Sequence, residues 1–119
     1  MSSLQLVLLL LISASLYAQS TSGRLSGSVT DPTGAATPNA QVSAINLETG
    51  FKLAERTSAM GQFVLYPMPP GNYRITILKS GFNTFEIPSL KIDVSQSLIR
   101  NVAMELASST QSVSVVAEA

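Results

Sequence analysis

Apolar and polar side chains alternate along most of the chain from Gly23 onward. A period of two places successive side chains on opposite faces of a β-strand, and no window in this region has the 3.6-residue period of an amphipathic helix. In the clearest example, Tyr73, Ile75 and Ile77 share one face. The pattern marks eight short segments, from which we expect about seven strands. They are residues 24–30, 40–45, 51–57, 63–66, 73–78, 82–87, 90–94 and 98–106, with 82–87 and 90–94 on either side of Pro88.

Turn-forming residues separate these strands. Asp31-Pro32-Thr33-Gly34 has the order of a tight turn, because Asp opens it, Pro presets φ and Gly closes it. Pro67–Gly71 contains three prolines, each of which removes a ladder donor, so we expect a connection there. Many short strands punctuated by turns are typical of a sandwich. The sequence therefore predicts a single all-β domain, an antiparallel, seven-stranded β-sandwich.

The same alternation predicts which side chains are buried between the sheets. Val102, Met104 and Leu106 are expected to face inward in the last strand, and the polar segment 51–57 is expected at an edge. The expected core residues are the larger apolar ones on the inward faces, namely Val29, Val42, Phe63, Tyr73, Ile75, Ile77 and Met104.

The first 18 residues have a different pattern. An unbroken apolar run, residues 6–12, is followed by small residues up to Ala18 and then by polar Gln19. The run is shorter than the 20 or so apolar residues of a membrane-spanning helix, so it predicts a signal peptide at 1–18, with a linker at 19–22. Because no Cys stands near residue 19, no lipid anchor is expected. The mature chain is predicted to be exported.

Composition limits the chemistry available to the chain. Its 119 residues suffice for one domain, and seven basic residues balance seven acidic ones, which argues against a nucleic-acid partner. The chain has no Cys and no His, which removes thiol nucleophiles, imidazole bases and the usual zinc ligands. We therefore expect no enzyme activity, no cofactor and no metal. Six of the seven carboxylates are considered for hydrolysis, and none lies in a loop rich enough in such groups to suggest a site: Asp31, Glu48, Glu55, Glu86, Asp93 and Glu105. Asp31 and Glu48 are expected at turns, and Glu105 on the solvent face of the last strand.

A family resemblance covers nearly all of the mature chain. Six short motifs follow one another in order: residues 23–31, Pro38–Val42, Thr49-Gly50, Gly61–Phe63, Pro69–Tyr73 and Lys79–Phe82. This series resembles the carboxypeptidase regulatory-like domain, a transthyretin-like (prealbumin-like) sandwich, and we assign residues 23–107 to it. In metallocarboxypeptidases such a domain is an accessory to the catalytic domain, which implies that this chain is non-catalytic.

The resemblance also implies a cellular context. Similar domains follow the signal peptide of TonB-dependent outer-membrane receptors of Gram-negative bacteria, ahead of the plug and barrel. It implies a periplasmic N-terminal domain, whole or as a fragment of such a receptor, that acts through protein contacts and tethering. The neighbouring plug or barrel domain would be one partner.

The C-terminal segment, residues 108–119, is expected to be a linker and a tail. Its strand-forming part, 112–117, resembles a TonB box, which implies contacts from Ser112, Val113, Val115, Val116 and Ala117 to a TonB-like protein. An extended peptide of this kind suits strand addition to a partner's sheet edge. The alternatives are an eighth strand of the sandwich and a frayed end.

A second function stays open beside the first. A free-standing exported module, carbohydrate-binding-like or adhesive, would need exposed aromatic rings on which a sugar could stack. The chain has no Trp, which leaves Tyr66, Phe82 and Phe85 near turns as candidates for glycan binding. The alternative for these rings is that they close the ends of the sandwich.

Overall fold

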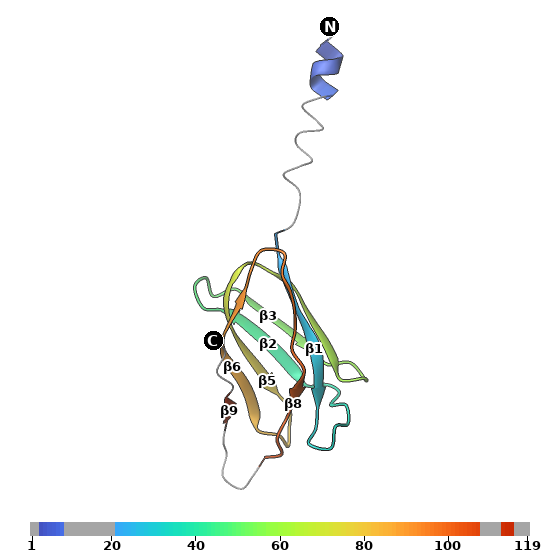
Figure 1. The fold of residues 1–119 in the computed structure, drawn as a ribbon, viewed down its shortest axis with the longest axis vertical. Coiled ribbons are helices and arrows are strands. Elements are labelled where there is room, and N and C mark those ends of the chain that lie inside the picture. The colour runs from blue at the N-terminus through green and yellow to red at the C-terminus, as the bar shows by residue number, and fades with distance from the viewer. Residues whose placement is uncertain (1–2, 9–20, 108–112, 116–119) are drawn as a thin grey trace.

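Two β-sheets pack face to face in this computed structural model, which describes residues 3–8, 21–107 and 113–115 (Figure 1). The all-β sandwich predicted from the sequence is confirmed. Residues 3–8 form a short helix with exposed apolar side chains, and no described helix is long and apolar enough to cross a membrane. The strands are β1 Gly23–Thr30, β2 Gln41–Asn46, β3 Lys52–Arg56, β4 Gln62–Met68, β5 Gly71–Leu78, β6 Thr84–Ile92, β7 Ser97–Ile99, β8 Val102–Ala103 and β9 Val113–Val115.

The larger sheet has the order β3-β2-β5-β6-β9, and its first four strands are antiparallel neighbours. β1 is central in the smaller sheet, where it pairs antiparallel with β4 and in parallel with both β7 and β8. The segment expected as one last strand is therefore divided in two along β1. The polar strand β3 lies at the edge of its sheet, as the sequence predicts.

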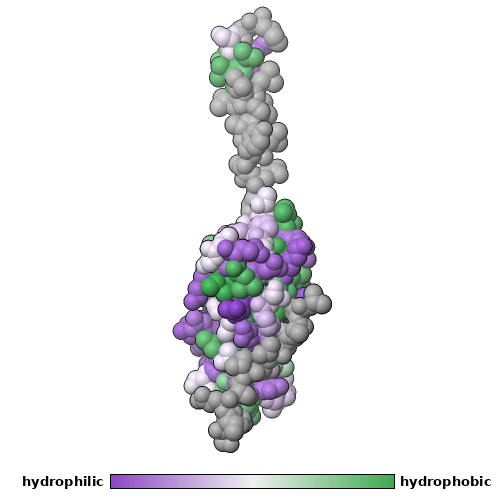
Figure 2. Space-filling view, turned by 90° about the vertical axis from the view of Figure 1, so that its left-hand side faces the viewer, coloured by the Kyte–Doolittle hydropathy of each residue, from purple (hydrophilic) through white to green (hydrophobic). Residues whose placement is uncertain are grey.

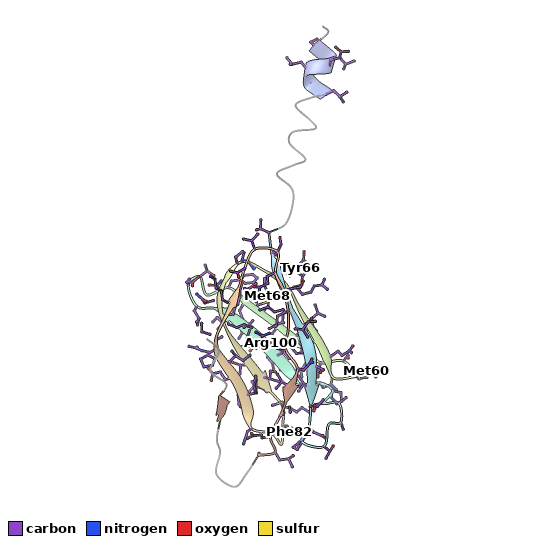
Figure 3. All side chains as sticks on the ribbon, viewed as in Figure 1. Met60, Tyr66, Met68, Phe82 and Arg100 are labelled. Carbon is purple, nitrogen blue, oxygen red and sulfur yellow. The ribbon has the colours of Figure 1, made fainter. Side chains whose placement is uncertain are left out.

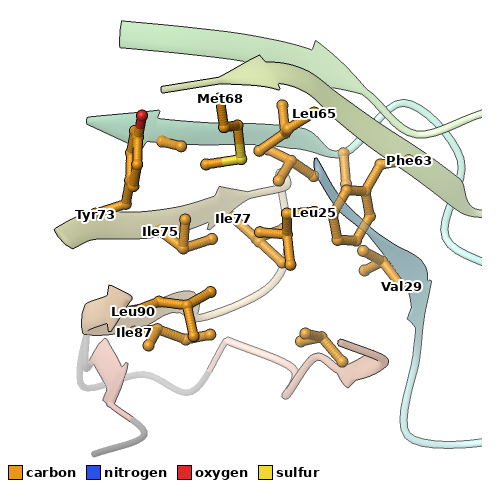
Figure 4. Packing of buried hydrophobic residues seen from close by; sticks show 14 of the residues in the cluster. Leu25, Val29, Phe63, Leu65, Met68, Tyr73, Ile75, Ile77, Ile87 and Leu90 are labelled. Atoms are coloured by element: carbon orange, nitrogen blue, oxygen red, sulfur yellow. The ribbon is translucent and has the colours of Figure 1, made fainter. Parts of the chain in front are cut away.

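The inward faces of both sheets form one apolar core (Figure 4). All seven core residues predicted from the alternation are buried. Tyr73 is fully buried, and its hydroxyl donates a hydrogen bond to the carbonyl of Pro69, so the polar end of the ring has a partner. The remaining core residues are Leu25, Ala40, Ala44, Leu65, Met68, Ile87, Leu90, Ile92 and Val102.

Leu106 does not face inward, which corrects the prediction for the end of the domain. Its exposed fraction is 63%, whereas Val102 and Met104 are buried. The chain leaves β1 after Met104 and turns to the β5–β6 connection, where Leu106 forms an isolated bridge with Phe82. The two-residue period therefore stops applying at this point.

Pro67 and Met68 belong to β4 and Gly71 begins β5, so the connection expected from Pro67 to Gly71 is confined to Pro69 and Pro70. The register shifts there, because Tyr66 and Pro67 both lie opposite Arg24. Such a bulge leaves a residue without a ladder partner, and a proline then costs no hydrogen bond. The Tyr66–Pro67 peptide bond is cis.

Pro88 is accommodated in the same way. Ile87 pairs with Ile75, and Leu90 pairs with Tyr73. Pro88 and Ser89 therefore both lie opposite one residue of β5, Arg74. The two short strands expected around Pro88 are therefore one bulged strand, β6.

Gly27 permits the close approach of β1 to the segment between β7 and β8. A Cβ atom at this position would lie only 1.7 Å from the carbonyl oxygen of Arg100. The amide of Arg100 donates to the carbonyl of Ser26 at 2.9 Å, which holds the two segments at that separation.

Thr57 and Thr37 form a buried polar corner beside β2. The hydroxyl of Thr57 donates to the carbonyl of Thr37 at 2.6 Å and accepts the amide of Ala40 at 2.8 Å. The hydroxyl of Thr37 is also buried, but it has no hydrogen-bond partner among the described residues. One hydroxyl thus satisfies two backbone groups, and its neighbour satisfies none.

This contrast predicts opposite results for the same substitution at the two sites. Thr57→Val leaves a buried N–H and a buried C=O unpaired, so the free energy of unfolding should fall by about 2 kcal/mol. Thr37→Val removes a buried hydroxyl without a partner and should be neutral or stabilising. Urea unfolding of both variants measures this, and equal losses at the two positions would contradict it.

Candidate functional site

The tail residues Val113 and Val115 lie in β9, on the outer edge of the larger sheet. β9 runs parallel to β6, with Val113 opposite Thr84, Ser114 opposite Phe85 and Val115 opposite Glu86. The backbone of the predicted partner-binding segment is therefore extended and engaged on a strand edge. Ser112, Val116 and Ala117, the other residues predicted for this contact, lie outside the described residues.

The edge that receives β9 is short. β6 pairs with β5 on its other side, and its bulge at Pro88 and Ser89 begins two residues after Glu86. A proline donates no backbone hydrogen bond, so a ladder cannot continue regularly past it. Only the start of β6 can therefore accept another strand in a regular register.

Two backbone hydrogen bonds fix the root of the tail beside this edge. The amide of Asn83 donates to the carbonyl of Glu105 at 2.8 Å, and the amide of Ala107 donates to the carbonyl of Gly81 at 3.0 Å. The chain thus reaches Ala107 next to the residues that directly precede β6. The loop before β6 and the root of the tail are consequently held as one unit.

The three aromatic residues proposed for glycan binding do not come together. Tyr66 lies on β4 of the smaller sheet, and its side chain is half exposed, whereas Phe82 and Phe85 are partly buried against the core. Figure 3 shows Tyr66 and Phe82 toward opposite ends of the sandwich. Phe82 and Phe85 therefore help to close the core, and Tyr66 alone presents a ring to solvent.

The ring of Tyr66 has a cationic neighbour. The guanidinium carbon of Arg24 lies 5.2 Å from the ring centroid, a distance at which the cation is attracted to the aromatic face. A sugar stacking on that face would have to displace the guanidinium.

A shallow hollow that sequence reasoning did not identify lies at one end of the larger sheet. Its volume is about 510 Å³, and its lining includes the cationic side chains of Arg56 and Lys79. The cross-strand register explains it, since Arg56, Gln41 and Leu78 pair in a row across β3, β2 and β5. Residue spacing alone gives no such register. Arg56, Lys79 and Gln41 can donate hydrogen bonds into this open depression. Such a lining suits an anionic or polyhydroxylated ligand.

The carboxylates considered for hydrolysis are dispersed. Glu86 pairs with Arg74 at 3.2 Å, and Asp93 pairs with Lys91 at 3.6 Å. Glu48 accepts the side-chain amide of Asn72 at 3.0 Å. Within the described residues no three His, Cys, Asp or Glu side chains are grouped so that they could hold a metal ion.

Asp31 opens the turn after β1, as the sequence indicated. Its Oδ1 accepts the hydroxyl of Thr33 at 2.6 Å and the amides of Thr33 and Ala35 at 2.8 and 3.1 Å. The Thr33 hydroxyl is the largest cause of a lowered pKa for this carboxyl, and the turn amides add to it. The ionised carboxylate of Asp31 therefore stabilises the turn by accepting these hydrogen bonds.

Comparison with known proteins identifies the family of this domain. A family model described as the carboxypeptidase regulatory-like domain matches residues 24–105. No curated protein matches the chain in sequence.

Several solved structures share the fold. A 3-chlorocatechol 1,2-dioxygenase from Rhodococcus opacus is 12% identical, with a TM-score of 0.54 over 75% of this chain and 61% of its own. The TIE protein of Bacillus anthracis is 16% identical, with a TM-score of 0.59 over 73% and 17%. A type II cohesin-X-dockerin complex from Acetivibrio cellulolyticus is 19% identical, with a TM-score of 0.53 over 71% and 58%. The chain spans less than two thirds of each of these proteins, and the likeness concerns the fold alone.

The Asp31 turn predicts a pH dependence of stability. Because the folded-state pKa is below the ordinary value of 3.8, the stabilisation is fully present above that pH and is lost as the pH falls through the lower folded pKa. Asp31→Asn should therefore lower the free energy of unfolding at neutral pH, and its difference from the wild type should shrink in acid. Urea unfolding as a function of pH measures this. An Asn variant that loses as much stability in acid as the wild type would contradict it.

Proposed function

The chain belongs to the carboxypeptidase regulatory-like domain family, and from this premise we propose that it is a non-catalytic periplasmic domain at the N-terminus of a TonB-dependent outer-membrane receptor. There it makes protein contacts and tethers the receptor, with the C-terminal tail offered to a TonB-like protein. The order of segments supports this proposal: an apolar N-terminal run, then the family domain, then a strand-forming tail.

One observation carries the proposal. Val113–Val115 adopts a strand and pairs with a sheet edge through its backbone. Strand addition also uses backbone N–H and C=O groups. The side chains need only be compatible with an extended backbone. Alternating valines favour that form because β-branched side chains restrict χ1.

We infer that the domain is not an enzyme. The chain contains no His and no Cys. Asp31, Glu48, Glu86 and Asp93 each have a turn, amide or cation partner that accounts for them. The dioxygenases share the fold at an identity of 12% or less in the chains compared, which carries no activity to this chain.

The periplasmic location is part of the proposal. Residues 1–18 have the layout of a signal peptide. Leu4, Leu6 and Leu8 are exposed, so these leucines add nothing to the apolar core. Removal of these exposed leucines on export would therefore cost the described core nothing.

The proposal predicts that the tail binds the periplasmic domain of a TonB-type protein. Ser114→Pro removes a backbone donor in the middle of the tail strand, so the affinity should fall by about tenfold or more. Ser109→Pro makes the same exchange in the segment before the tail and should leave the affinity unchanged. Titration of the immobilised chain, followed by surface plasmon resonance, measures both. Equal affinities for the Ser114 variant and the wild type would exclude strand addition by the tail.

The alternative function, an exported glycan-binding or adhesion module, is favoured by the half-exposed ring of Tyr66. It predicts retention of the chain on an insoluble polysaccharide, lost in Tyr66→Ala and kept in Tyr66→Phe, which preserves the ring for stacking. Phe82→Ala is a poorer test because Phe82 packs against the core. Co-sedimentation with a panel of polysaccharides measures this, and no retention on any of them would exclude the glycan-binding alternative.

A further inference from the structure

The start of β6 is a strand edge with a defined occupant. Without β9, the larger sheet ends at β6, and an edge strand presents unpaired N–H and C=O groups to any extended chain that can reach them. Among the residues that the structure describes, β9 pairs with Thr84, Phe85 and Glu86 of β6. This pairing is parallel, whereas β6 and β5 pair antiparallel.

The fixed root of the tail explains why this segment occupies this edge. Glu105 and Ala107 are hydrogen-bonded to Asn83 and Gly81, so the tail starts beside the residue that precedes β6. Only residues 108–112 separate that root from β9. A short tether keeps a segment at a high effective concentration near its site, so even a short ladder is populated.

The same arrangement limits the strength of the contact. The bulge at Pro88 and Ser89 follows soon after Glu86 and prevents a longer regular ladder. The residues coloured in Figure 2, on the side of the domain that bears β6, are mostly hydrophilic, with hydrophobic ones in small clusters. A short ladder on a mostly hydrophilic side holds the tail and can also release it.

From these observations we propose that the Thr84–Glu86 edge is a strand-accepting surface whose occupant is the chain's own Val113–Val115 segment, and that a partner adding a strand to the edge of this segment that faces β6 must first displace it. A partner that pairs with the edge of the tail strand facing β6 needs the N–H and C=O groups that β6 already engages, so these two pairings exclude each other. The evidence for pairing of the tail with β6 is the strand register. The identity of the competing partner rests on the proposed function.

Disulfide trapping tests the docking in the purified chain. The chain has no native cysteine, so any disulfide must join introduced residues. Neighbouring strands lie about 4.8 Å apart, which is within the Cα separation that a disulfide bridges. Thr84→Cys with Val113→Cys should therefore cross-link under mild oxidation.

A matched pair supplies the control. Lys91→Cys with Val113→Cys uses the same tail position and an exposed residue of the same strand, beyond the bulge. We expect the Thr84 pair to cross-link about tenfold faster or more than the Lys91 pair, since only the first pair is held in register. Adding Ser114→Pro to the Thr84 pair should abolish the difference, and this substitution lies in the tail, where it leaves the sandwich intact. Equal rates for the two cysteine pairs would overturn the proposal.

A second arm separates the docking from the proposed function. The periplasmic domain of a TonB-type protein, added in excess, should slow the Thr84–Val113 cross-link, and the cross-linked chain should bind that domain only after reduction. A fast, register-specific cross-link that is indifferent to the added domain would retain the docking and reject the proposed partner.

Discussion

Apolar contact between the two sheets is the interaction on which the rest of the structure depends. The chain has no Cys for a disulfide, and the Arg74–Glu86 and Lys91–Asp93 ion pairs are partly or largely exposed to solvent, where such pairs contribute about 1 kcal/mol or less. The core therefore has to hold the sheets at a fixed separation. Tyr73, Ile75 and Ile77 from one sheet meet Leu25 and Phe63 from the other (Figure 4). A second close approach, at Gly27, lies within the smaller sheet, where a side chain would push the β7–β8 segment away from β1.

The alternation of side chains predicted the centre of this fold well, because burial on one face of a strand is what produces the pattern. Val29, Val42 and Met104 are buried as expected. The errors lie where geometry departs from a regular ladder. Pro67 and Pro88 both sit at bulges, and a bulge depends on a partner strand that a local pattern does not specify. Leu106 keeps the period, but the chain has already left the sheet at that point.

The strand-forming character of the tail was predictable from the sequence, and the edge that the strand pairs with was not. Alternating valines identified Val113 and Val115 as strand-forming, and the structure places them in a strand. Which edge accepts that strand is decided by the contacts of Gly81 and Asn83 with the root of the tail, and these join residues far apart in sequence. Similarly, spacing selected Phe82 and Phe85 as loop aromatics, but only the packing shows that they contribute to the core.

The two edges of the larger sheet explain why the tail occupies one of them. β3 carries Lys52, Glu55 and Arg56 within five residues, and charged side chains discourage pairing because a second strand would desolvate them. At the β6 edge the nearest charge is that of Glu86, and Arg74 of the adjacent strand pairs with it at 3.2 Å. β6 therefore accepts a strand at a lower electrostatic cost. The core residues that the structure describes lie between Leu25 and Met104, so we expect loss of β9 to leave their packing unchanged. The stability of the sandwich and the availability of its tail are thus determined by different parts of the sequence.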